Sequence, residues 1–296
     1  MAEPKNYKMA SEVRYSAEAF AKRAARALRR QGQTSSREAE QKDCEQDEES
    51  DNMWENTYAF SSFKLSVQEE FGGESCVGGT QWPGGVRVAR YLDNPKAFPP
   101  GTLKGKTLLD LGSGCGLVAA VAAKHGARVV AAEKDIVIPL LKENLTTNGV
   151  LLDHGASEHS KGNTSHASLP SSLPSNSPLE EGKVVVHEFY WGPDARHPLA
   201  PFDLIIAAAC LYMPKTVPLL LHTLWNVSDS QSLILLCSIL GADTLQAFKE
   251  EVGGFFHIRA LDETNGNVIG TSSDDNLSSI DVATRILILE RKRQSG

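Results

Sequence analysis

The sequence contains no uninterrupted apolar stretch of the roughly eighteen residues that a membrane-spanning helix needs. Its first residues also lack the apolar core of a secretory signal. The basic, helix-prone segment 17–30 faintly resembles an organelle-targeting helix, but Glu3, Glu12 and Glu18 count against targeting because such peptides contain few acids. We therefore expect a soluble protein of the cytoplasm, with the nucleus also open, and no membrane partner.

The sequence has few cysteines and a negative net charge. The 296 residues include 5 cysteines, an odd number with no C-x-x-C pair, so neither a disulfide framework nor a zinc site is indicated. A reducing compartment and no bound metal follow as expectations. The net charge of −7 and the pI of about 5.7 argue against a protein that coats nucleic acid, which would present a basic face. We expect no nucleic-acid partner.

Large apolar residues are sparse in two parts of the chain. Residues 38–55 are dense in Glu and Asp, and cannot bury enough apolar surface to order themselves. We therefore predict a charged, mostly disordered extension over residues 1–57. Residues 152–182 are rich in Ser, Asn, His and Pro, which is typical of a low-complexity surface insert. The remaining length suits one domain over 58–292.

A glycine-rich turn is the most informative motif. The apolar run Leu108–Leu111 predicts a buried strand, and Gly112, Gly114 and Gly116 follow it directly. Such a turn lets a ligand approach main-chain N–H groups at the start of a helix. The dinucleotide fingerprint G-x-G-x-x-G would need glycine at Leu117, so a nicotinamide or flavin enzyme is disfavoured. A plain tight turn between strand and helix is the other interpretation.

The next predicted strand strengthens the case for a nucleotide-like ligand. Residues 128–132 are again short and apolar, and they end at Glu133. Folds of this kind place a carboxylate at this position to hold ribose hydroxyls. The turn and the acidic residue together are more specific than either alone.

Strands and helices alternate along the rest of the domain. We predict a β-hairpin at 58–60 and 63–67, helices at 86–92, 117–125, 138–147, 217–225 and 244–252, and further strands at 184–189, 202–208, 233–238, 255–260 and 285–289. This alternation predicts an α/β, Rossmann-like fold with one mostly parallel sheet and helices on both faces. Glu133, Trp191 and the segment 209–212 all follow strands, so they should converge at one edge of the sheet.

These motifs resemble a known family. The sequence Gly79-Thr80-Gln81-Trp82-Pro83, the turn Leu109-Asp110-Leu111-Gly112-Ser113-Gly114-Cys115-Gly116-Leu117, the pair Trp191-Gly192 and the segment 203–212 carry the resemblance. Over residues 58–292 the chain resembles the seven-strand class I methyltransferases, and among them the methyltransferase-like 21 group of protein-lysine methyltransferases. The resemblance implies S-adenosylmethionine as cofactor, a lysine of another protein as acceptor, and a sheet of seven strands.

The resemblance also implies which residues contact the cofactor: Trp82, Gly112, Ser113, Gly114, Glu133, Trp191 and Ala208. Trp82 would border the pocket and the glycine turn would pass under the amino-acid part of the cofactor. Glu133 would hold the ribose, Trp191 would lie against the adenine, and Ala208 would give backbone to the wall. For both tryptophans the structural alternative is an aromatic ring that anchors a loop to the core.

One position departs from the family pattern. The group carries Asp-x-x-Tyr after its fourth strand, and this chain has Ala209-Cys210-Leu211-Tyr212. Tyr212 is the candidate catalytic residue, with a core tyrosine as the alternative. Methyl transfer depends mostly on alignment and on a neutral amine, so the missing carboxylate affects rate and acceptor more than cofactor binding. A different acceptor, or a weakly catalytic cofactor-binding interaction protein, therefore stays open.

Overall fold

The computed structural model describes residues 53–70, 77–153, 180–238, 241–263, 265–271 and 285–292. The basic segment 17–30, most of the charged extension and most of the low-complexity insert lie outside the described residues. The disorder expected for those segments therefore stays a prediction.

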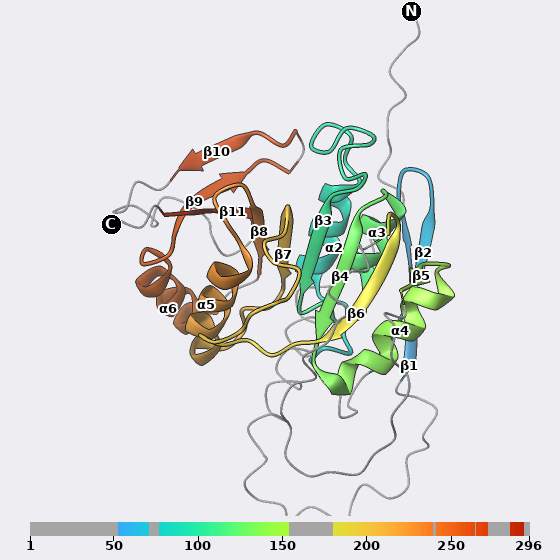
Figure 1. The fold of residues 1–296 in the computed structure, drawn as a ribbon, viewed down its shortest axis with the longest axis horizontal. Helices are drawn as coiled ribbons and strands as arrows, with labels where there is room; N and C mark the ends of the chain where they lie inside the picture. Colours follow the sequence, from blue (N-terminus) through green and yellow to red (C-terminus); the bar gives the residue numbers. More distant parts are fainter. Residues whose placement is uncertain are drawn as a thin grey trace, which may run out of the picture. The chain divides into compact units, whose positions relative to one another are not determined.

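One large sheet organises the described residues (Figure 1). Its strands are, in sheet order, β10 (Val268–Thr271), β9 (Phe256–Leu261), β11 (Leu287–Arg291), β8 (Leu233–Cys237), β7 (Leu204–Ala208), β3 (Thr107–Leu111), β4 (Arg128–Glu133), β6 (Lys183–Glu188) and β5 (Leu151–Leu152). The six strands from β5 to β8 pair in parallel, whereas β11 is antiparallel to β8 and β9, and β10 is antiparallel to β9. The predicted mostly parallel α/β sheet is confirmed.

The predicted number of seven strands is wrong for this sheet, which has nine in the described residues. The two additional strands, β5 and β10, lie at its edges. Leu151–Leu152 is too short to give an alternating pattern, and the register of β10 shifts between Val268 and Gly270. Short or irregular edge strands leave little periodic signal in a sequence.

Helices cover both faces of the sheet, as predicted. The first face carries α2 (Pro83–Leu92), α3 (Leu117–Lys124) and α4 (Ile138–Thr147), whose apolar residues share one core cluster with Leu108 and Val129. The second face carries α5 (Val217–Val227) and α6 (Ala242–Val252), which pack over Leu109 and Val130. Short 3-10 helices, η1 (Asp135–Val137) and η2 (Pro214–Thr216), precede α4 and α5.

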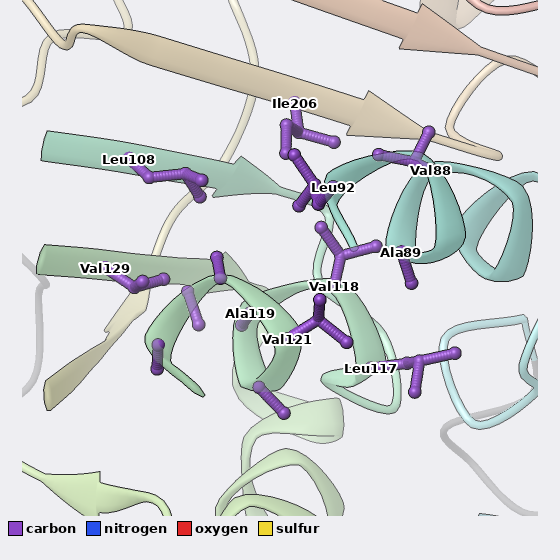
Figure 2. Packing of buried hydrophobic residues seen from close by; sticks show 14 of the residues in the cluster. Val88, Ala89, Leu92, Leu108, Leu117, Val118, Ala119, Val121, Val129 and Ile206 are labelled. Atoms are coloured by element: carbon purple, nitrogen blue, oxygen red, sulfur yellow. The ribbon is translucent and has the colours of Figure 1, made fainter. Parts of the chain in front are cut away.

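Figure 2 shows the part of the first core where α2 and α3 meet beside β3 and β4. Val88 and Leu92 of α2 face Val118 of α3, and Leu108 and Val129 lie beside them on the strands, all nearly inaccessible to solvent. Full burial of one such side chain stabilises the fold by about 1.5–3 kcal/mol. This packing fixes α2 and α3 at the carboxyl edge of the sheet, where the glycine turn lies.

A separate two-stranded sheet forms the predicted hairpin. Strands β1 (Met53–Ala59) and β2 (Lys64–Glu70) pair antiparallel, so residues 53–57, expected in the extension, belong to β1. Asn144 of α4 and Asn148, the residue that caps the end of this helix, bind the edge of β2 as a neighbouring strand would. Each accepts a backbone N–H and donates to a backbone carbonyl, Asn144 at Gln68 (2.8 and 2.9 Å) and Asn148 at Ser66 (2.8 and 2.6 Å).

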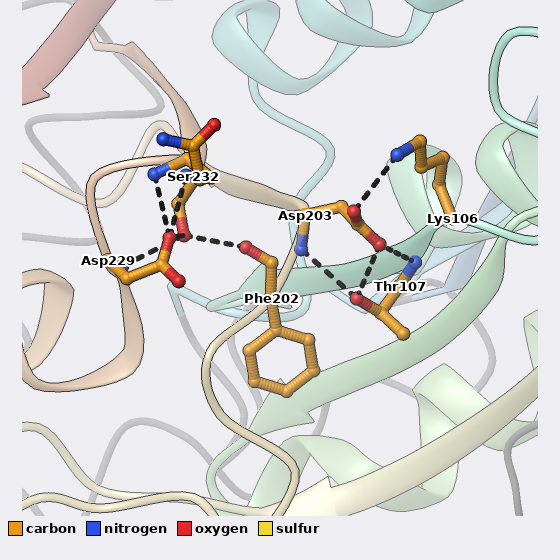
Figure 3. Close-up of polar contacts among 7 residues, drawn as sticks. Lys106, Thr107, Phe202, Asp203, Asp229 and Ser232 are labelled. Atoms are coloured by element: carbon orange, nitrogen blue, oxygen red, sulfur yellow. Dashed lines mark hydrogen bonds and ion pairs between the residues drawn. The ribbon is translucent and has the colours of Figure 1, made fainter.

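Asp203 closes the opposite, amino edge of the sheet (Figure 3). Its Oδ2 accepts the backbone N–H and the hydroxyl of Thr107 at 2.8 and 2.9 Å, and its Oδ1 accepts from Lys106 Nζ at 3.0 Å. Although Asp203 begins the segment that carries the family resemblance, it lies at the end of β7 away from the glycine turn. Its observed contacts are therefore structural, joining β3 to β7.

We expect Asp203→Ala to lower the free energy of unfolding by about 1–2 kcal/mol at neutral pH, since charge-assisted hydrogen bonds are lost at a partly exposed site. Burial raises the pKa of Asp203, but the hydrogen bonds from Thr107 and Lys106 outweigh burial and leave that pKa below its usual value. The contribution is present above the ordinary carboxyl pKa and disappears as pH falls through the lowered one. Urea unfolding at several pH values measures this contribution to the free energy of unfolding, and Asp194→Ala, at an exposed position, is the control. Equal losses of stability in the two variants would contradict the structural role assigned to Asp203.

Candidate functional site

The glycine turn joins β3 to α3 in a conformation that favours glycine. Gly112, Gly114 and Gly116 have φ of 78°, 54° and 86°, in the left-handed region where side chains are strained. A Cβ on Gly112 would lie 2.9 Å from Cys210 Sγ, and one on Gly114 would lie 3.1 Å from the Gly78 carbonyl oxygen. The turn therefore needs glycine for both its backbone shape and its close packing.

Glu133 lies against this turn from the end of β4. Its Oε2 accepts the Gly114 N–H at 2.8 Å, and its Oε1 accepts the Lys134 N–H at 2.9 Å. Burial raises the pKa of Glu133, and these two backbone hydrogen bonds oppose the increase. The structure thus brings together the two sequence signals, the turn and the acidic residue after the second parallel strand.

A small pocket, open to solvent, lies over the turn. Its lining residues are Thr80, Gln81, Trp82, Gly85, Asp110, Gly112, Ser113, Gly114, Cys115, Val118, Ala208 and Ala209. The predicted residues Trp82, Ser113 and Ala208 are therefore in its wall, together with Gly112 and Gly114.

The other predicted residues lie close to the pocket without lining it. Glu133 reaches the wall through Gly114, while Trp191 is half-buried and packs beside Gly112, where a Cβ would come 3.3 Å from its ring. Tyr212 is half-buried in the loop before η2 and is not among the lining residues. Its proposed contact with a substrate therefore stays a prediction.

The segment 77–82 forms the roof of the pocket. Trp82 Nε1 donates to the Val77 carbonyl at 2.8 Å, and the Trp82 carbonyl accepts the Gly85 N–H at 3.0 Å, which fixes the start of α2. The neighbouring Gln81 donates its backbone N–H to the buried Glu69 carboxylate at 3.0 Å. Trp82 therefore both anchors the roof and lines the pocket, so the two interpretations of this residue are compatible.

Asp110 lines the pocket but was not predicted from the sequence as a site residue. It is 1% exposed, and its Oδ2 has no hydrogen-bond partner among the described residues. Burial raises the pKa of Asp110 to about 7, with hydrogen bonds from Ser113 and Ala119 opposing and the nearby charge of Glu133 adding to the rise. A carboxyl group inside an apolar strand was the available signal, since such groups are seldom buried without a purpose.

Ala209 occupies the position of the family's aspartate. Its φ is 60°, and it is the single non-glycine residue with positive φ in the described chain. Its N–H donates to the Cys237 carbonyl at 2.6 Å, and a Cβ on Gly84 of α2 would lie 3.2 Å from its nitrogen. Aspartate tolerates this backbone conformation better than most residues, so the local geometry still suits a carboxylate.

The cysteines near the pocket are protonated thiols. Burial, with added repulsion from nearby carboxylates, raises the pKa of Cys115 and Cys210 well above the usual range. They are therefore poor nucleophiles. Within the described ranges, His, Cys, Asp and Glu do not gather in a group of three that could hold a metal ion, and no helix there is long and apolar enough to cross a membrane.

Comparison with known proteins gives matches over most of the domain. A family model described as lysine methyltransferase matches residues 59–159 and 164–251. The chain is 28% identical over 182 residues to protein N-lysine methyltransferase METTL21A of Mus musculus, covering 61% of this chain and 68% of that protein. The Danio rerio protein of the same name is 26% identical over 186 residues (62% and 71%), and EEF1A lysine methyltransferase 3 of Mus musculus is 23% identical over 205 residues (68% and 73%).

We expect Asp110→Asn to stabilise the ligand-free protein above about pH 7. Because the folded-state pKa is raised, the folded protein keeps a proton that the unfolded chain has lost, and stability falls as pH rises from the ordinary carboxyl pKa toward 7. Asparagine removes that penalty, which is on the order of 4 kcal/mol for a rise of about three pKa units. The free energies of unfolding of wild type and Asp110→Asn, measured at pH 5 and pH 8, give the size of this effect. A gain in stability of equal size at both pH values, or no gain, would contradict a raised pKa for Asp110.

Proposed function

The chain belongs to the lysine methyltransferase family, and from that premise we propose that its cofactor, S-adenosylmethionine, binds over the glycine turn and that the acceptor lysine enters beside Ala209. The protein is an S-adenosylmethionine-dependent lysine N-methyltransferase. The family match argues against the hypothesis of a nicotinamide enzyme that the sequence analysis considered. It also favours an active methyltransferase over a weakly catalytic cofactor-binding protein. The observation that carries the proposed site is the pocket bounded by Trp82, the glycine turn and Ala208.

The residues of the pocket fit this cofactor. The turn offers a cradle that a Cβ at Gly112 or Gly114 would fill. The buried Asp110 oxygen without a partner is an acceptor for an ammonium group, and Glu133 is an acceptor suited to ribose hydroxyls. Asp110 and Glu133 also favour a ligand of net positive charge, as this cofactor is.

When bound, S-adenosylmethionine supplies an electrophilic methyl group on a sulfonium. The protein then has to hold the lysine amine in line and in its neutral form. Ala208 and Ala209 present small apolar side chains to the pocket, and an ammonium that loses water there has a lowered pKa. We propose that Tyr212 accepts a hydrogen bond from the incoming amine, with its ring favouring the charge that develops on nitrogen.

The substrate class that we propose is taken from the names of the similar proteins. Their names describe action on protein lysines, and one of them names EEF1A. We propose that this chain acts on a lysine of an intact protein, with EEF1A as the first candidate to assay. We further propose that it does so in the cytoplasm, with the nucleus as a second compartment to examine, and without a nucleic-acid or membrane partner.

The experiment for the proposed function uses full-length protein, radiolabelled S-adenosylmethionine and a cell extract. Labelling of a discrete protein, followed by mass spectrometry that locates the methyl group on a lysine, is the expected result. Label on a small molecule, or on a side chain other than lysine, would overturn the lysine assignment for this chain.

We expect Glu133→Ala to weaken cofactor binding about ten- to a hundredfold, because hydrogen bonds to a charged acceptor contribute roughly 1.5–3 kcal/mol. Calorimetric titration with S-adenosylmethionine measures the affinity. Glu188→Ala, an exposed carboxylate at the end of the neighbouring strand β6, is the matched control and should bind nearly as well as wild type. An unchanged affinity in folded Glu133→Ala would remove Glu133 from the site.

Residues 209 and 212 are expected to act on the transfer step. Tyr212→Phe should slow methyl transfer by tenfold or more, about 1.4 kcal/mol in the barrier, with little change in cofactor affinity. Ala209→Asp should raise activity toward lysine, since its backbone conformation accepts aspartate. Single-turnover rates with saturating cofactor measure both variants. If the wild type binds cofactor but transfers no methyl group, and Ala209→Asp transfers to lysine, then the natural chain is a binding protein.

A further inference from the structure

Glu69 is a fully buried carboxylate in the hairpin, 0% exposed. Its Oε1 accepts from Asn56 Nδ2 across β1 and β2 at 2.5 Å, and its Oε2 accepts the Gln81 backbone N–H at 3.0 Å. Both oxygens thus accept hydrogen bonds from amide donors. Accepted hydrogen bonds favour the ionised form of a carboxyl group, whereas burial opposes ionisation.

This charge lies directly behind the pocket wall. Gln81, whose backbone N–H donates this hydrogen bond to Glu69, is a lining residue of the roof. On the other side, the Glu69 charge acts on Cys115 of the glycine turn, whose thiol pKa is raised by burial first and then by Glu69 and Glu133. Glu69 is therefore near both the roof and the floor of the pocket without lining it.

Strand β2 is also joined by hydrogen bonds to the roof segment 77–82 and, through Asn144, to the glycine turn. The Glu70 N–H donates to the Gly79 carbonyl of the roof at 2.9 Å. Asn144 Nδ2 donates to both the Gln68 carbonyl of β2 (2.9 Å) and the Cys115 carbonyl of the glycine turn (3.0 Å). Displacement of Glu69 would consequently disturb the pocket from the hairpin side.

The charge matters because donor and product differ in charge at one atom. S-adenosylmethionine carries a positive sulfonium, whereas S-adenosylhomocysteine, left after transfer, has a neutral thioether. We propose that Glu69 is a specificity-determining residue that makes the pocket prefer the sulfonium donor over the thioether product. This inference rests on the proposed function, and it assigns to the hairpin a part in product release.

The test compares both ligands on the full chain. Wild type, Glu69→Gln and Asn56→Ala are titrated calorimetrically with S-adenosylmethionine and S-adenosylhomocysteine. Glu69→Gln keeps an acceptor for the Gln81 N–H but removes the charge, so donor affinity should fall roughly fivefold to tenfold more than product affinity, because the lost charge attracts only the sulfonium. Asn56→Ala keeps the charge and loses one hydrogen bond, so both affinities should change by a common factor.

An equal change of both affinities in Glu69→Gln would overturn the proposal and leave Glu69 with a purely structural role. If Glu69→Gln gives no cooperative melt, Glu69→Asp replaces it. That variant keeps the charge and shortens the side chain, so the ratio of the two affinities should stay at the wild-type value, and a changed ratio would contradict the proposal. Failure of wild type to bind either ligand would instead reject the proposed function.

Discussion

Carboxylates at the pocket, of which Glu69 and Asp110 are buried and Glu133 is partly buried, are the constraint on which the site depends. Glu133 holds the glycine turn through the Gly114 N–H, and Glu69 holds the roof through the Gln81 N–H. Asp110 is also buried, and one of its oxygens lacks a hydrogen-bond partner among the described residues. Burying such groups costs free energy unless they are hydrogen-bonded or meet a cation. A cationic cofactor meets this requirement, which relates the architecture of the pocket directly to its ligand.

The rest of the fold serves to bring these carboxylates together. Parallel pairing of β3, β4 and β7 places the glycine turn, Glu133 and Ala208–Ala209 at one edge, where the strand order reverses. The hairpin is joined to that edge by Asn144 and Asn148, and Asp203 closes the opposite edge. Ala209, where the family pattern predicted from the sequence has an aspartate, lines the same pocket as the glycine turn.

Much of this could be predicted from the sequence, because the informative signals were local. Glycines that need positive φ, an acid directly after an apolar strand, and alternating apolar periods each depend on a few neighbouring residues. Other features depend on long-range packing. The pairing of Asn144 with Gln68, the contact of Glu69 with Gln81 and the edge strand β10 leave no periodic trace. Tyr212 illustrates the limit, since its motif gave a role but could not place its side chain in the pocket wall.

Proton release on cofactor binding tests the central claim most directly. At pH 6.5 the cofactor's amino group is already protonated, whereas Asp110, with a pKa raised to about 7, is largely neutral in the ligand-free protein. Titration of the full-length protein with S-adenosylmethionine in buffers of different ionisation enthalpy measures the number of protons exchanged. The account predicts release of a substantial fraction of one proton per bound cofactor, lost in Asp110→Asn. A binding enthalpy that does not depend on the buffer would contradict a pocket built around buried carboxylates that meet a cation.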